Sequence, residues 1–173
     1  GNSGKIKELK ALLSSKHCIS QGDLGICEAD ETGLTFIENA LLKARHASHL
    51  SNMPAIADDS GLVVPVLGGR PGIYSSRFAG ENATEQDNIR HLLSLLKAQT
   101  TPTEAFFYCA VVYLRHADDP TPCIGTGILK GHIVSNSKGV HGFGYDPIFY
   151  LPEYGCTLAE LSPATKNTLS HRA

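Results

Sequence analysis

The spacing of hydrophobic residues along the chain predicts alternating helices and strands. Apolar positions recur at helical intervals, which predicts helices over residues 6–13, 35–47 and 84–97 and a short one over 157–161. Runs of β-branched and aromatic residues predict strands at 55–57, 63–67, 105–114, 123–134 and 148–151, and a strand with a turn at 18–26. This alternation is typical of an α/β fold with a mixed sheet, from which the hairpin over 105–134 projects as a smaller lobe.

The composition is that of an ordinary globular protein. Hydrophobic residues make up 42% and charged residues 18% of the 173 residues, enough for one domain with a sizeable core. A formal net charge of -2 gives no global reason to expect nucleic-acid binding, and no run is apolar enough to span a membrane. The five cysteines include no CxxC pair, which argues against a disulfide framework or a zinc site and favours a cytoplasmic protein.

Two adjacent carboxylates, Asp58 and Asp59, stand between the apolar runs 55–57 and 62–64. Adjacent acids repel, so a cation, a proton or a hydrogen-bond donor is expected beside them. If 55–57 is a buried strand, the pair leaves the sheet at its carboxyl end, where α/β sheets bind ligands, and Ser60 and Gly61 form a turn or bulge. A surface turn with solvated acids explains the same residues, and the pair alone leaves both explanations open.

Two glycine-rich segments carry further ligand chemistry. The first precedes helix 6–13 and ends in a lysine, an arrangement that binds phosphate; it consists of Gly1, Asn2, Ser3, Gly4 and Lys5. Its spacing does not match the Walker motif, and a plain N-cap loop is the simpler explanation. The second, residues 139–147, offers the flat faces of Phe143 and Tyr145 and the acceptors of Asp146 to a base; an aromatic-anchored surface loop is the alternative.

Polar pairs elsewhere are ambiguous by themselves. Asn39 and Lys43 lie four residues apart, so their side chains share one face of the predicted helix 35–47. This face either points into a cleft or is exposed to solvent. Asp118 and Asp119 precede Pro120 and predict a solvated hairpin tip. Taken together, a lysine-bearing loop, an acid pair suited to a divalent metal, a stacking loop and the late basic residues Lys166, His171 and Arg172 describe a site for a nucleoside polyphosphate.

The chain also resembles the non-standard purine (inosine/xanthosine) triphosphate pyrophosphatases. The shared motifs occur in the order of that family across almost the whole chain. They are Gly1-Asn2-Ser3-Gly4-Lys5, Glu31-Thr32-Gly33 with Thr35-Phe36-x-Glu38-Asn39-Ala40-x-x-Lys43-Ala44, Ala57-Asp58-Asp59-Ser60-Gly61-Leu62, Pro71-Gly72-Ile73-Tyr74-Ser75-Ser76-Arg77, Gly142-Phe143-Gly144-Tyr145-Asp146-Pro147 and Ser170-His171-Arg172.

The resemblance implies hydrolysis of ITP, dITP or XTP to the nucleoside monophosphate and pyrophosphate. It further implies an elongated mixed sheet with two lobes, an active-site cleft between them and a homodimer. The chain would be a single domain over 1–173 that lacks the family's strand before Gly1 and its helix after Arg172. The expected partner is a small-molecule purine nucleoside triphosphate, without nucleic acid or membrane, and the expected cofactor is Mg²⁺.

The resemblance also implies roles for individual residues. Asp59 would be the general base and a metal ligand, with Asp58 supporting the metal site and Lys43 neutralising phosphate charge. The family's second metal-binding acid, usually glutamate, falls on Asp30, with Glu31 as a substitute. The substrate would contact the loop 1–5 and the residues Ser60, Phe143, Gly144, Tyr145, Asp146, Lys166, His171 and Arg172. A nucleotide-binding regulatory module without catalysis is the alternative function, and the intact acid pair argues against it.

Overall fold

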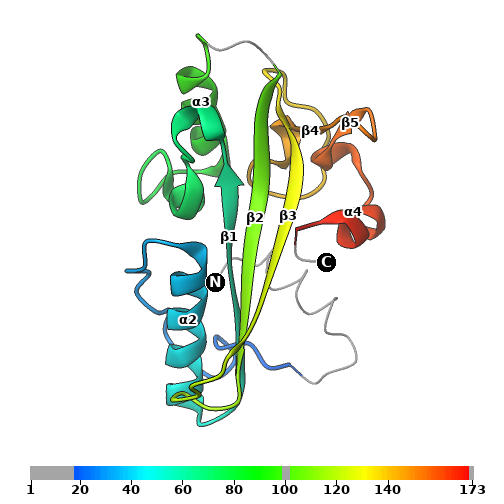
Figure 1. Cartoon of the computed structure of the whole chain (residues 1–173). Helices are drawn as coiled ribbons and strands as arrows, with labels where there is room; N and C mark the ends of the chain where they lie inside the picture. Colours follow the sequence, from blue (N-terminus) through cyan, green and yellow to red (C-terminus); the bar gives the residue numbers. More distant parts are fainter. Residues whose placement is uncertain (1–17, 99–101, 172–173) are drawn as a thin grey trace. The chain divides into compact units, whose positions relative to one another are not determined.

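The computed structural model describes residues 18–98 and 102–171 (Figure 1). Five strands pair in chain order; they are β1 (Ala55–Val63), β2 (Thr103–Leu114), β3 (Cys123–Ile133), β4 (Phe149–Leu151) and β5 (Cys156–Thr157). The sheet is antiparallel, with His132 of β3 opposite Tyr150 of β4, and Tyr150 opposite Thr157 of β5. The predicted α/β class is confirmed, although the described ranges hold no parallel strand of the expected mixed sheet.

The α-helices begin where the sequence signals a cap. The α-helices are α2 (Phe36–Ser51), α3 (Glu85–Leu95) and α4 (Pro163–Leu169). Short 3-10 helices are η1 (Pro65–Leu67), η2 (Gly72–Arg77), η3 (Asp146–Ile148) and η4 (Leu158–Glu160). The helices predicted over 35–47 and 84–97 are confirmed, since each starts after a threonine whose side chain completes a capping box. No helix within the described ranges is long and apolar enough to cross a bilayer.

Three local predictions were wrong. Residues 18–26 form a turn over 21–25 without a strand. Strand β1 continues through the acid pair to Val63, so the acids do not leave the sheet and Ser60-Gly61 is neither a turn nor the end of the strand. Residues 65–67 are a 3-10 segment because Pro65 starts it and removes a backbone donor that a strand would use.

The contacts divide the chain into two compact units. The described residues of the first unit are 18–60 and 109–127, and those of the second are 61–98, 102–108 and 128–171. The predicted cleft and the single-domain organisation stay predictions.

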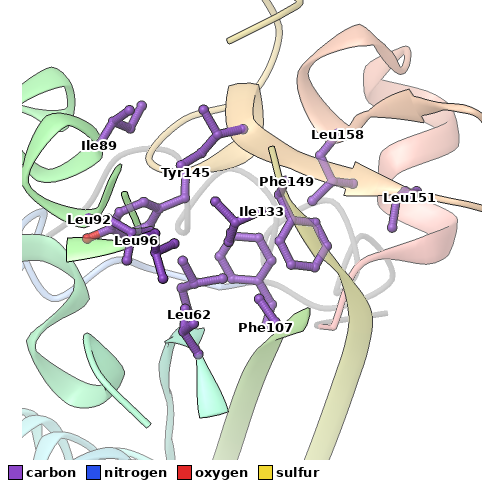
Figure 2. Close-up of a cluster of buried hydrophobic side chains, with 13 residues drawn as sticks. Leu62, Ile89, Leu92, Leu96, Phe107, Ile133, Tyr145, Phe149, Leu151 and Leu158 are labelled. Carbon is purple, nitrogen blue, oxygen red and sulfur yellow. The ribbon is translucent and has the colours of Figure 1, made fainter. Parts of the chain in front are cut away.

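A hydrophobic cluster forms the core of the second unit (Figure 2). Its centre includes Phe107 of β2 and Phe149 of β4, whose ring centroids are 4.6 Å apart. Around them pack Leu62, Val64, Ile89, Leu92, Leu96, Ala105, Ile133, Tyr145, Ile148, Leu151 and Leu158. The cluster fixes the end of β1 and the loop that leads into β4, because both contribute buried side chains to it.

The turn between β2 and β3, in the first unit, is built on a buried charge. Asp119 is 1% exposed and accepts hydrogen bonds from Arg115 Nε at 2.8 Å and Nη2 at 2.7 Å. The Arg115 guanidinium, followed by the Thr121 backbone N–H, lowers the pKa of Asp119 below its ordinary value. Arg45 of α2 also donates to the Ala117 carbonyl oxygen at 2.6 Å. The expectation of a solvated tip was therefore wrong for Asp119, while Asp118 is exposed.

We expect Asp119→Asn to lower the unfolding temperature at neutral pH, because the amide cannot accept the bidentate guanidinium bond of a carboxylate. Because the pKa of Asp119 is lower in the folded than in the unfolded protein, its charge stabilises the fold fully at pH values above the ordinary pKa of 3.8. This stabilisation is lost as the pH falls from 3.8 through the pKa of the folded state. The difference from the wild type should therefore shrink when unfolding is repeated at about pH 3. Asp118→Asn is the matched control, because it removes the same charge from the exposed neighbour; an equal effect of both variants would contradict the assignment.

Candidate active site

In the first unit, one lysine joins two carboxylates that are distant in sequence. The Lys43 ammonium Nζ donates to Asp59 Oδ1 at 2.8 Å and to Glu31 Oε1 at 3.1 Å. Asp59 is 4% exposed, so its charge is removed from water and needs this partner. The explanation of the acid pair as a solvated surface turn is excluded for Asp59.

Three local structures bring these groups together. Lys43 lies two turns into α2, whose start is fixed by the Thr35–Glu38 capping box. Asp59 lies in the middle of β1, and Glu31 lies in the irregular segment before α2. Each charged group therefore comes from a different element, and the ion pairs form only in the folded chain.

The electrostatics of Lys43 favour the charged form. Burial by itself would lower the pKa of this ammonium, but the charge of Asp59 and the hydrogen bond to it, followed by Glu31, raise the pKa above its usual value. Lys43 therefore carries a permanent positive charge near neutral pH. Such a charge suits the neutralisation of a phosphate oxygen.

The two acids of the pair have separate surroundings. Successive side chains of a strand point to opposite faces, and Asp58 is indeed less buried than Asp59. Asp58 Oδ2 accepts from Ser60 Oγ at 3.2 Å and lies 4.0 Å from the Cys109 sulfur of β2. Asp59, with the lysine, and Asp58, with a hydroxyl, are thus placed for different roles.

The structure separates the two candidates for the second acidic ligand. Asp30 is exposed, whereas Glu31 lies against the same ammonium as Asp59. Across residues 18–98 and 102–171, no three His, Cys, Asp or Glu side chains form a group that could hold a metal ion by themselves. A pair of carboxylates fits Mg²⁺, which commonly takes one or two protein carboxylates and completes its shell with phosphates and water.

A loop contact that the sequence analysis missed holds β1 directly after the acids. Ser75 Oγ accepts from the Leu62 N–H at 2.9 Å and donates to the Gly72 carbonyl oxygen at 2.6 Å. A Cβ on Gly61 would lie well inside contact distance of both the Gly72 oxygen and Ser75 Oγ. The glycine after Ser60 is thus required by the close approach of η2, and the Gly72–Arg77 motif was the available signal.

The glycine-rich loop of the second unit surrounds a buried ion pair. Lys166 Nζ of α4 donates to Asp146 Oδ2 at 2.7 Å, and both side chains are less than a tenth exposed. The same Oδ2 accepts from the Phe143 N–H at 2.9 Å, and the ammonium lies 4.6 Å from the centroid of the Phe143 ring. The structure thus brings Lys166 to the predicted loop residues Phe143 and Asp146, which lie 20 or more positions earlier in the sequence.

Tyr145 differs from the expectation. Its side chain is 4% exposed within the hydrophobic cluster (Figure 2), and its hydroxyl donates to the Ser75 carbonyl oxygen at 3.0 Å. Burial raises the pKa of this phenol. The ring is therefore part of the hydrophobic core of the second unit. Gly144, with a positive φ of 62°, lets the loop turn beside it.

The remaining predicted residues divide by position. The ring of His171 is stacked on Phe107 at 4.9 Å between centroids, inside the second unit. Ser60 is buried and bonds Asp58. The loop 1–5, with Lys5, and Arg172 lie outside the described residues.

These features define a class of protein. An α/β fold carries a lysine–carboxylate cluster fit for a phosphate with a divalent metal, and a second cluster of one aromatic ring and an ion pair fit for a flat polar ligand. Such a set belongs to a nucleotide-handling enzyme.

Comparison with known proteins agrees with this class. The sequence matches the Ham1 family over residues 1–173. It is 59% identical over 173 residues to a dITP/XTP pyrophosphatase of Legionella pneumophila (strain Paris), and 55% identical over 175 residues to one of Photorhabdus laumondii, covering 99% of this chain and 89% of each relative. The solved structure of a HAM1 protein from Coxiella burnetii superposes with a TM-score of 0.92 at 43% identity, over 99% of this chain and 88% of that one. The chain belongs to the Ham1 family.

We expect Gly61→Ala to destabilise the protein by about 1–3 kcal/mol, because the new methyl group must displace η2 from β1. The free energy of unfolding in urea measures the loss. Gly125→Ala in β3 is the matched control, since a Cβ there meets no atom within 4 Å. Equal stability of the two variants would show that η2 does not depend on the glycine.

Proposed function

We propose that this chain hydrolyses non-canonical purine nucleoside triphosphates, namely ITP, dITP and XTP, to the nucleoside monophosphate and pyrophosphate. The observation that carries the proposal is the Lys43 ammonium held between Asp59 and Glu31 in a member of the Ham1 family, whose relatives are named dITP/XTP pyrophosphatases. A regulatory module without catalysis would not need a buried carboxylate paired with a lysine, so this alternative is not favoured.

In the proposed mechanism, Asp59 accepts a proton from the attacking water. A carboxylate can act as this general base, and the ion pair with Lys43 would hold Asp59 in position for it. Lys43 places positive charge where the polyphosphate gains negative charge during cleavage. Asp58, which accepts a hydrogen bond from Ser60, would support the metal site. Ser60 would contact the substrate.

Asp59 would hold Mg²⁺ together with Glu31, which contacts the same ammonium, or with the exposed Asp30. When bound, the metal would supply Lewis-acid stabilisation of phosphate oxygens. Lys5 of the loop 1–5 would add a further positive charge on the phosphates.

The base would bind at the second cluster. Phe143 offers a ring for stacking, and Lys166 has donors suited to the 6-oxo group of hypoxanthine and xanthine. Adenine presents an amino donor at that position, which would face the ammonium without an acceptor and so be rejected. Gly144, the Tyr145 backbone, His171 and Arg172 would complete the pocket. Homodimer formation and a cytoplasmic location are further proposals, the second supported by five free cysteines.

The direct test is release of pyrophosphate from a panel of nucleoside triphosphates with and without Mg²⁺. We expect ITP, dITP and XTP to be cleaved far faster than ATP, and Asp59→Asn to slow cleavage by about 10²–10⁴-fold with an unchanged circular dichroism spectrum. Release of orthophosphate alone would contradict the proposed cleavage position. Tight nucleotide binding without turnover would favour the regulatory module.

Glu31→Gln and Asp30→Asn form a matched pair that tests the metal site. The two substitutions each remove one negative charge, and the two positions are adjacent in sequence. Only Glu31, however, contacts the Lys43 ammonium that is paired with Asp59. We expect Glu31→Gln to raise the Mg²⁺ concentration needed for half-maximal activity by about 10-fold or more, and Asp30→Asn to leave it near the wild-type value. The opposite order would assign the ligand to Asp30.

A further inference from the structure

Helix α2 begins with a side-chain contact to the loop before it. After the N-cap Thr35 and the capping-box acid Glu38 comes Asn39, which is 0% exposed. Asn39 Oδ1 accepts from the Gly33 N–H at 2.8 Å. A Cβ on Gly33 would lie only 2.7 Å from the same oxygen, so the loop packs directly on the amide.

Helix α3, in the second unit, repeats this arrangement. Thr84 and Asp87 form its capping box, and the next residue, Asn88, is also buried. Asn88 Oδ1 accepts from the Ala79 N–H at 2.8 Å, and Asn88 Nδ2 donates to the Ser76 carbonyl oxygen at 3.0 Å. Asn88 therefore uses both ends of its amide to hold the preceding loop, as buried polar groups generally do.

The two asparagines differ in one hydrogen bond. Asn39 Nδ2 is buried and has no hydrogen-bond partner within the part of the chain that the structure describes. Exchanging the oxygen and nitrogen of the Asn39 amide would not give Nδ2 a partner. The Gly33 N–H needs an acceptor opposite it, so Oδ1 must occupy that position. A buried donor without an acceptor costs free energy, so an oxygen atom supplied by a ligand would stabilise this site.

The position of Asn39 indicates the acceptor. Lys43 is one helical turn further along α2, and residues four apart share a helix face. The loop residue that Asn39 holds, Gly33, follows Glu31 by two positions, and Glu31 contacts Lys43. The unpartnered donor thus belongs to the helix turn and the loop that form the lysine–carboxylate cluster.

We propose that Asn39 has two functions in the phosphate site, one at each end of its amide. Its Oδ1 positions the Glu31-bearing loop through Gly33, and its Nδ2 donates to an oxygen of the bound triphosphate. Because Nδ2 is covered in the ligand-free chain, this second bond forms only when the ligand displaces the covering atoms. The proposal rests on the proposed function for its choice of ligand.

The test separates the two ends of the amide. Asn39→Asp keeps an acceptor for Gly33 and removes the donor, whereas Asn39→Ala removes both without adding charge. The probe is inorganic triphosphate with Mg²⁺, whose affinity is measured by calorimetry at low and at high salt. Salt screens repulsion by the new carboxylate but does not replace a lost hydrogen bond. Asn88→Asp is the matched control, because it breaks the bond to Ser76 in the equivalent position of α3.

We expect both Asn39 variants to bind triphosphate about 10-fold more weakly than the wild type at either salt concentration. Hydrogen exchange of the Gly33 amide should stay slow in Asn39→Asp and become fast in Asn39→Ala. Asn88→Asp should lower the unfolding temperature and leave triphosphate affinity unchanged. If Asn39→Asp bound triphosphate as tightly as the wild type, the donor role of Nδ2 would be overturned, whether or not Asn39→Ala bound more weakly.

These results are independent of turnover. A wild-type chain that binds triphosphate but releases no pyrophosphate would contradict the hydrolase and leave the role of Asn39 measurable. A wild type that hydrolyses ITP while Asn39→Asp binds and turns over normally would contradict only the role of Asn39.

Discussion

The contact on which the candidate site depends is the ammonium of Lys43 between Asp59 and Glu31. A partly buried lysine without partners would tend to lose its proton, and a buried aspartate without a partner would tend to gain one. Here the charge of Asp59 and the hydrogen bond to it raise the pKa of Lys43, so the ammonium stays protonated at neutral pH. The same pairing brings the proposed proton acceptor, Asp59, within 2.8 Å of the cation proposed to neutralise phosphate charge.

The positions of Lys43 and Asp59 are set by the start of helix α2 and by the alternation of side chains along strand β1. The capping box at Thr35 and Glu38 sets where α2 starts and hence where Lys43 lies along it. The two-residue repeat of β1 turns Asp59 and Asp58 to opposite faces, although the two are adjacent in sequence. Two like charges on neighbouring residues are thereby tolerated without sharing a proton, because one meets a lysine and the other meets Ser60.

The parts of this structure that sequence reasoning predicts are those set by local chemistry. The capping boxes predict α2 and α3 because a threonine and an acid three residues later act within one turn. Ser60-Gly61 was misread because the reason for the glycine is η2, more than ten residues away, which packs where a Cβ would be. Tyr145 was misread because its hydroxyl bonds Ser75, 70 positions earlier, and its ring joins the core. Motif order across the chain predicts a set of site residues, but the burial and the partners of these residues depend on such distant contacts.

The second ion pair of the molecule follows the same physical rule as the first. Lys166 is held by Asp146 beside Phe143, and both charges are almost fully buried. In each unit, a lysine proposed to meet a ligand oxygen is paired with a carboxylate in the ligand-free chain. A ligand that binds there must supply a hydrogen-bond acceptor, because it has to replace or join the charge-assisted bond between the lysine and its carboxylate. A phosphate or a 6-oxo group offers that acceptor, whereas the amino group of adenine does not, so under the proposed function adenine would place a donor against the ammonium and be disfavoured.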